Sequence, residues 1–166
     1  MNHIYIDFIM KKCQELFKEK LKFYDLSWKE IKISSIIDQI FMKVVRIQNI
    51  QERGFQEVKE EKIIDTFIDV INYIVITLIK LNIDFKKKVS HSEVMNIYIQ
   101  KFDQIKDLYD EKTQNENISI ENLLEEILYL KQKETKILYK KLENICLKML
   151  NMTIFLSIKN IPKKRN

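Results

Sequence analysis

The stretch DTFIDVINYIVITLIK, residues 65–80, decides the fold. Its apolar side chains recur every three to four residues from Phe67 to Ile79, which predicts a helix. Val70 and Ile76 make much of the opposite side apolar too, so we expect other helices to surround this one. The same helix carries a polar stripe along one side, formed by Asp65, Asp69, Asn72 and Tyr73. Carboxylates on such an apolar helix need a compensating partner, so the question for function is what they face.

The composition favours an all-α protein. The chain has 166 residues, which is enough for one domain with a sizeable core. It contains a single glycine, Gly54, and a single proline, Pro162, too few turn residues for a β-rich or Rossmann-type fold. Hydrophobic residues at 46% and charged residues at 32% are typical of a packed protein rather than a disordered one.

Charge and cysteine content restrict the partners and the compartment. The net charge of +5 is a weak sign of nucleic-acid binding, because lysine is frequent throughout a chain that is also rich in Ile and Asn. Cys13 and Cys146 are isolated, as reduced cysteines are, and His3 and His91 lack metal-ligand spacing. No apolar run reaches the ~20 residues of a membrane span, and the first residues do not read as a signal peptide. We therefore expect a soluble cytoplasmic protein with no membrane role and no main role on nucleic acid.

The hydrophobic periodicity predicts six helices, at residues 5–23, 34–52, 58–81, 90–111, 119–134 and 136–159. Residues 25–33 break the pattern and bring Trp28 into a connecting segment. The two halves resemble each other, since VINYIVITLIK at 70–80 aligns with MLNMTIFLSIK at 149–159. We expect one helical bundle of two tandem three-helix repeats, 1–84 and 85–160, about a pseudo-twofold axis, with a basic tail at 161–166. The alternative is that any two amphipathic helices of this composition align equally well.

The first half resembles a known family. SSIIDQIFMKVVRI at residues 34–47, followed by INY at 71–73 and LI at 78–79, is similar to nucleotide modification associated domain 1. The likeness extends to CQELF at 13–17, to Tyr24 and to Trp28, and covers about residues 5–81. The resemblance implies a helical fold related to the MazG-type all-α nucleoside triphosphate pyrophosphatases, and some family members carry two copies of the domain.

The sequence also departs from the family pattern. The family's Asp-Tyr-Gly before the tryptophan reads Phe23-Tyr24-Asp25, and the acid expected one turn before Asp69 is Thr66. In the second half, Lys148 takes the place of Asp69 and no tryptophan segment is present. We therefore expect the second half to be scaffold and the first half to retain part of a site.

The activity that the resemblance implies is Mg²⁺-dependent hydrolysis of a nucleotide. Such hydrolysis needs a divalent metal, and Mg²⁺ prefers oxygen ligands. The candidate metal ligands are Asp38, Glu61, Asp65 and Asp69, of which Asp38 and Asp69 are also the candidate catalytic residues. The candidate substrate-binding residues are Lys43 and Arg46 for phosphate, Trp28 and Tyr24 for a base, and Asn72 and Tyr73 for orientation.

Each of these assignments has a structural alternative. Asp69 can form an ion pair with Lys43 or Arg46 between neighbouring helices. Trp28 and Tyr24 can be core aromatic residues with a satisfied polar tip. Three functions therefore stay open: a nucleotide pyrophosphohydrolase, a non-catalytic binding or oligomerisation module, and an unrelated helical adaptor. The sequence also leaves open which nucleotide is bound and whether the chain forms a homodimer.

Overall fold

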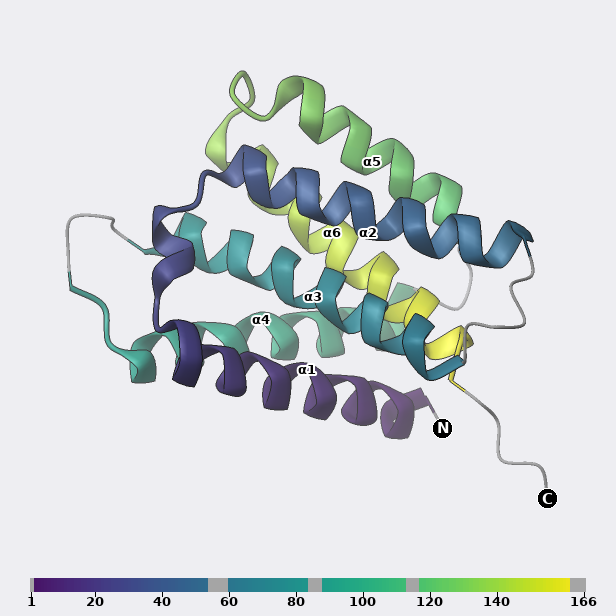
Figure 1. Cartoon of the computed structure of the whole chain (residues 1–166), viewed down its shortest axis with the longest axis horizontal. Coiled ribbons are helices and arrows are strands. Elements are labelled where there is room, and N and C mark those ends of the chain that lie inside the picture. Colours follow the sequence, from purple (N-terminus) through teal and green to yellow (C-terminus); the bar gives the residue numbers. More distant parts are fainter. Residues whose placement is uncertain (1, 54–59, 84–87, 113–116, 162–166) are drawn as a thin grey trace.

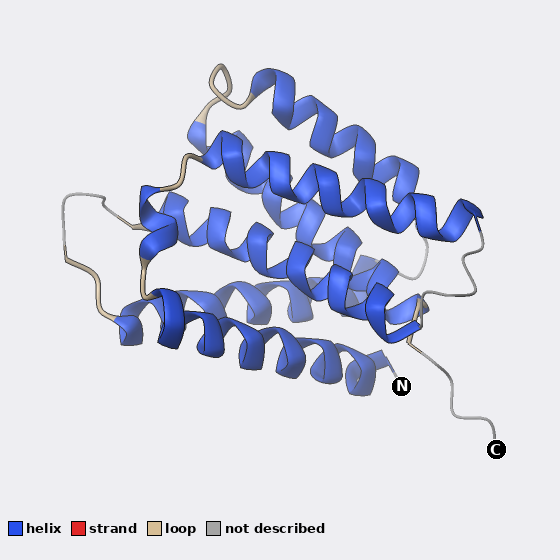
Figure 2. Ribbon diagram, viewed as in Figure 1, coloured by secondary structure: helices blue, strands red, loops and turns tan. Residues whose placement is uncertain are grey.

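The computed structural model describes residues 2–53, 60–83, 88–112 and 117–161, and the regular elements in these ranges are all helical (Figures 1 and 2). The α-helices are α1 (Asn2–Tyr24), α2 (Ile33–Arg53), α3 (Glu60–Asn82), α4 (His91–Lys112), α5 (Ile120–Lys133) and α6 (Tyr139–Lys159). A short 3₁₀-helix, η1 (Ser27–Glu30), lies in the segment that was expected to break the helical pattern. For the described ranges, the predictions of an all-α bundle and of about six helices are confirmed. Gly54 and the tail 162–166 lie outside the described residues, as do residues 84–87 and 113–116 of the connections.

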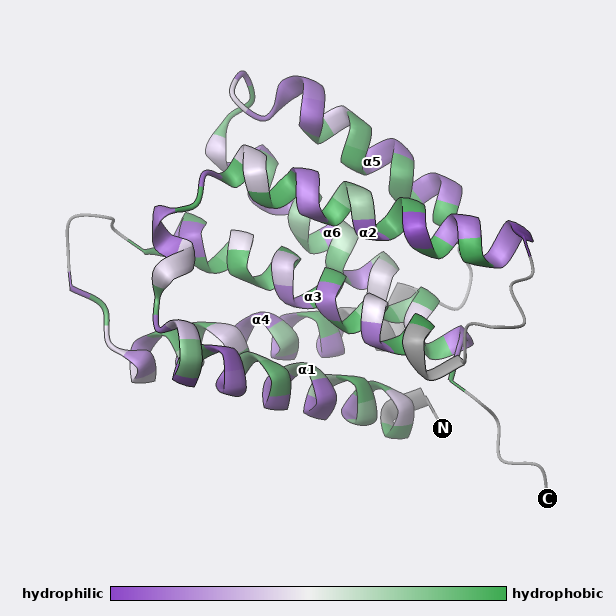
Figure 3. Ribbon diagram, viewed as in Figure 1, coloured by the Kyte–Doolittle hydropathy of each residue, from purple (hydrophilic) through white to green (hydrophobic). Residues whose placement is uncertain are grey.

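The third helix is the centre of the bundle, as its apolar sequence predicts. It packs against α1, α2, α4 and α6, and Figure 1 shows it with α6 behind it. Its residues Phe67, Val70, Ile71, Ile74 and Val75 have 0% exposed surface. The outer helices α1 and α5 alternate hydrophobic and hydrophilic residues along their length, as helices with one buried side do (Figure 3). Even so, none of the described helices has a stretch long and apolar enough to cross a bilayer.

The helix neighbours follow a pattern that a two-repeat arrangement would produce. Exchanging α1, α2 and α3 with α4, α5 and α6 turns the α1–α3 contact into α4–α6, α2–α3 into α5–α6, and α1–α6 into α3–α4. All of these pairs are packed in the structure, as are the pairs α2–α5, α3–α6 and α1–α4, which the exchange leaves unchanged. The internal repeat and its boundary near residue 84 remain predictions, but the packing agrees with them.

Candidate functional site

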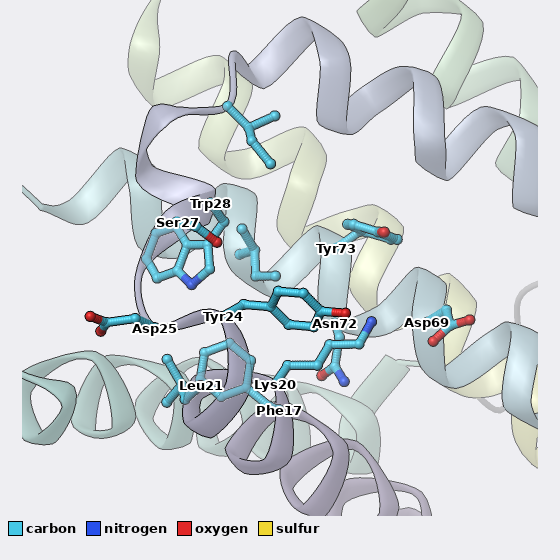
Figure 4. Close-up of a pocket in the computed structure, with 12 residues that line it drawn as sticks. Phe17, Lys20, Leu21, Tyr24, Asp25, Ser27, Trp28, Asp69, Asn72 and Tyr73 are labelled. Atoms are coloured by element: carbon cyan, nitrogen blue, oxygen red, sulfur yellow. The ribbon is translucent and has the colours of Figure 1, made fainter.

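A pocket of about 320 Å³ opens between the end of α1, η1 and the middle of α3 (Figure 4). Its walls combine aromatic rings with a few polar groups. The aromatic residues are Phe17, Tyr24, Trp28 and Tyr73, the aliphatic ones are Leu21, Ile31 and Ile76, and the polar ones are Lys20, Asp25, Ser27, Asp69 and Asn72. A mainly apolar cavity with few polar groups is the usual form of a small-molecule site.

The end of α1 turns back sharply to place η1 over the pocket. Asp25 has a φ of +52°, in the left-handed region that favours glycine, and its N–H donates to the carbonyl oxygen of Leu21 at 3.0 Å. Asp tolerates this conformation better than most residues other than glycine, so Asp25 can hold the turn. Asp25 also pairs with His91 at the start of α4, and the hydrogen bond from His91 lowers the pKa of the Asp25 carboxyl.

A buried lysine anchors η1 from below. The Lys80 ammonium, on α3, donates to the carbonyl oxygens of Lys29 at 2.8 Å and Trp28 at 3.2 Å. Burial lowers the pKa of Lys80 by disfavouring its charged form, while the nearby Glu30 acts in the opposite direction. These bonds fix the backbone that carries Trp28, so they position the ring that forms one wall of the pocket.

A hydrogen-bonded amide forms the floor. The Asn72 Nδ2 donates to the Cys13 carbonyl oxygen at 3.1 Å, and its Oδ1 accepts from the Tyr98 hydroxyl at 2.7 Å. The Tyr98 ring stacks on Phe17 with a centroid distance of 4.4 Å, and burial raises the pKa of its hydroxyl. One side chain of α3 thus ties α1 and α4 together beneath the pocket, and both ends of its amide are already bonded within the protein.

Two charged groups lie on the side of the pocket away from Trp28 (Figure 4). The Lys20 ammonium lies 5.7 Å from the centre of the Tyr73 ring, a cation–π contact. The Asp69 carboxylate forms an ion pair with Lys43 of α2 at 3.1 Å, with both side chains partly exposed. The Asp69–Lys43 pair is the structural alternative that the sequence left open.

A second groove, of about 410 Å³, runs between α1 and α3 and shares Asp69 with the pocket. Four carboxylates line it, from Glu15 and Glu19 on α1 and from Asp65 and Asp69 on α3, with Lys12 as the cation among its lining residues. This groove is therefore predominantly negative.

The structure brings together only some of the predicted site residues. Trp28, Tyr24, Asn72 and Tyr73 line the pocket with Asp69. The predicted phosphate ligands line neither cavity. Lys43 pairs with Asp69 beside the pocket, and Arg46 is exposed on α2.

The predicted acidic cluster is more dispersed. Asp38 is exposed and pairs with Lys131 of α5, and it lines neither of the two cavities that Asp69 reaches. Asp65 lies with Asp69 in the second groove, and the Glu61 side chain lies outside the described residues. Among the side chains that the structure describes, no three of His, Cys, Asp or Glu come together in a way that could hold a metal ion. The described carboxylates therefore do not fit the expected Mg²⁺ cage.

Seven residues of α1 that line these cavities were not among the predicted ones, and four of them bear on the character of the two cavities. Phe17 and Lys20 line the pocket, and Glu15 and Glu19 face the second groove. The signal for the two acids was their four-residue spacing, which matches that of Asp65 and Asp69. The sequence did not single out Lys20, because lysine is frequent throughout the chain.

Comparison with known proteins places the pocket within a family segment. Residues 20–81 match the family model described as nucleotide modification associated domain 1. A search of curated proteins and a search of solved structures each found no match. Of the pocket's lining residues, all except Phe17 fall within the matched segment. The resemblance expected from the sequence is therefore confirmed over residues 20–81, the segment that the model of the nucleotide modification associated domain 1 family matches.

Proposed function

We propose that the pocket binds a nucleoside or nucleotide through its base. The observation that carries the proposal is the coincidence of the aromatic pocket with the family segment, whose name associates it with nucleotide modification. Aromatic rings accept bases by stacking, which contributes about 1–3 kcal/mol per base. The volume of about 320 Å³ is at the lower end of the range for small-molecule sites, and it suits a base with part of its sugar.

The charges around the pocket favour a ligand with few phosphates. Lys20 is positioned to meet an anionic group at the mouth, but the adjacent groove carries the carboxylates of Glu15, Glu19, Asp65 and Asp69. Those carboxylates repel a polyphosphate that would extend along the groove. A nucleoside or a nucleoside monophosphate therefore suits the pocket better than a triphosphate.

The described residues also favour binding without hydrolysis. Asp38 and Asp69, the two candidate catalytic acids, are each held by a lysine of another helix. These two acids also lie at different places, and among the described side chains no three of His, Cys, Asp or Glu come together where a metal ion could bind. We therefore propose the non-catalytic binding module ahead of the Mg²⁺-dependent pyrophosphohydrolase.

The only tryptophan of the chain, Trp28, allows a direct binding measurement. Nucleosides and nucleoside mono- and triphosphates, each with and without Mg²⁺, would be titrated while tryptophan fluorescence is recorded. We expect a saturable change with nucleosides or monophosphates. Tyr73→Leu should weaken binding about 5- to 100-fold through the lost stacking. Tyr129→Leu is the matched control, because Tyr129 is a partly buried tyrosine on α5 that does not line the pocket.

The base-binding part of the proposal would be contradicted by no saturable change with any compound of the panel. It would also be contradicted if Tyr73→Leu bound as well as the unsubstituted protein. Release of pyrophosphate or phosphate from triphosphates with Mg²⁺ or Mn²⁺, abolished by Asp69→Asn, would instead support the hydrolase. Such product release would overturn only the proposal that the module is non-catalytic.

A further inference from the structure

The indole N–H of Trp28 is a buried donor with no acceptor in the part of the chain that the structure describes. Trp28 is only 9% exposed, and its Nε1 has no hydrogen-bond partner among the described residues. Figure 4 shows this nitrogen turned toward Leu21 and Tyr24, inside the ring of pocket residues. By contrast, the polar side chains of Asn72 and Asp69, which also line the pocket, are bonded within the protein. The described residues contain one other buried polar atom without a partner, the Oδ1 of Asn151 on α6, which does not line the pocket, so the Trp28 N–H is distinguished by its place in the pocket wall.

A buried unmatched donor is unfavourable for folding. An indole N–H normally finds a partner when the ring is buried, because it loses its hydrogen bond to water and gains nothing in return. The backbone that carries this ring is nevertheless held firmly by Lys80. The structure therefore keeps the donor in an unfavourable place, which is the arrangement expected of a group whose acceptor arrives with a ligand.

We propose that the Trp28 N–H donates a hydrogen bond to an acceptor on the edge of the bound base, either a ring nitrogen or a carbonyl oxygen. This inference rests on the proposed function and deepens it. The base enters with that acceptor edge toward η1, and its sugar and any phosphate point toward Lys20 at the other side of the pocket. Trp28 is then a hydrogen-bond reader of the base and not only a stacking surface. The pocket selects heteroaromatic rings with an acceptor edge over rings that present only C–H or N–H groups there.

Access to this donor requires a small movement. The Nε1 atom is covered in the structure, and Tyr24, which lies beside it in Figure 4, is 67% exposed. A side chain with so much exposed surface changes rotamer readily, since little packing holds it. Rotation of Tyr24 opens the path to the indole edge and leaves its ring free to cover the base.

The test removes the N–H and keeps the ring. Trp28 would be replaced by benzothienylalanine, in which sulfur stands for the N–H, and the matched control is 4-fluorotryptophan, which keeps the donor. Calorimetric titration with adenosine, guanosine, cytidine and uridine monophosphates compares the three proteins. We expect the benzothienyl protein to bind the best ligand roughly ten- to a hundred-fold more weakly, whereas the fluorinated control binds like the natural protein. The melting temperature of the free benzothienyl protein should be unchanged or higher, because the donor has no partner there.

Three results are decisive. Equal affinity of the benzothienyl and natural proteins for the monophosphate would overturn the inference while the proposed function stands. A melting temperature of the free protein that falls along with the affinity would show a structural role for the N–H and also overturn it. Absence of binding to the natural protein would overturn both the inference and the proposed function. If the natural protein prefers the adenosine compound, the 1-, 3- and 7-deaza analogues identify the acceptor, because the one lacking it should bind both proteins equally.

Discussion

The hydroxyl of Tyr98 offers a test of how the pocket floor is held. Tyr98→Phe removes one oxygen and keeps the ring, which continues to stack on Phe17 and to contact Phe102. The substitution leaves the Oδ1 of Asn72 buried without its donor, since Asn72 is 3% exposed and the lost bond measures 2.7 Å. The change therefore isolates a single buried hydrogen bond.

The expected loss follows from that exchange. A buried acceptor left without its donor costs about 1–3 kcal/mol, and the missing oxygen leaves only a small void. We expect the free energy of unfolding to fall by about 2 kcal/mol, which corresponds to a decrease of roughly 4–8 °C in the melting temperature for a domain of this size. Replacing both partners removes the mismatch, so Tyr98→Phe combined with Asn72→Leu should cost about 1–2 kcal/mol less than the sum of the single changes.

Urea denaturation of the natural protein, the two single variants and the double variant measures the loss of unfolding free energy and the coupling between the two changes. Tyr73→Phe is the matched control, because the described residues offer the Tyr73 hydroxyl no hydrogen bond and its loss should leave stability within about 0.5 kcal/mol. If Tyr98→Phe loses no more than that control, or if the two changes in the cycle are additive, the Asn72–Tyr98 bond does not hold the floor. The pH dependence gives a second check. Because the folded-state pKa of Tyr98 is raised, its contribution is fully present below the unfolded value of about 10 and is lost as the pH rises above it, a loss that Tyr98→Phe should lack.

Three further predictions concern charge and backbone. Asp25→Gly should raise the melting temperature by roughly 1–3 °C at neutral pH, because glycine adopts the positive φ without strain; no rise would show that the His91 pair outweighs the strain. Its advantage should grow in acid, since the lowered pKa of Asp25 means that the carboxylate's contribution is present above about 3.9 and is lost as the pH falls through the folded-state value. Asp69→Asn should lower the free energy of unfolding by less than about 1 kcal/mol, an effect that high salt reduces, because the Lys43 pair is partly exposed; a loss several times larger in denaturant titrations would indicate a buried role. Millimolar Mg²⁺ should change the melting temperature by less than about 1 °C, and a larger, saturable rise would reveal a cation site.

The fold was predictable because its signal is local. Helical periodicity identifies each element from its own residues. Residues 65–80 are apolar around most of the helix circumference, which correctly predicted a central helix. The segment around Trp28 was recognisable because it interrupts that periodicity. The sequence also grouped six residues as one substrate-binding set. Tyr24, Trp28, Asn72 and Tyr73 of that set line one pocket, whereas Lys43 and Arg46 do not.

The acidic part of the site was not predictable in the same way. The direction in which a carboxylate faces depends on which helix packs beside it, and that contact is distant in sequence. Asp38 pairs with Lys131, which lies 93 positions further along the chain. Glu15 and Glu19 face Asp65 across a groove that only the α1–α3 packing creates. The four-residue spacing of Glu15 and Glu19 places them on one side of α1, but it does not show which helix they face, and nothing local in α2 shows the partner of Asp38.

The second half of the chain bears on how the Asp69–Lys43 pair should be understood. Lys148 aligns with Asp69, and it pairs with Glu126 of α5 at 2.6 Å. An ion pair therefore joins α2 to α3 and another joins α5 to α6, with the charges in opposite order, although Glu126 aligns with Gln39 and not with Lys43. A lysine cannot do the chemistry of a catalytic acid, whereas an ion pair can hold two helices together with either order of charges. The second half has no tryptophan segment. The two halves therefore have an ion pair between neighbouring helices in common, whereas the aromatic pocket is described for the first half. If the predicted repeat holds, this contrast favours a scaffold role for Asp69 and agrees with the proposal that Trp28 and its neighbours bind the ligand.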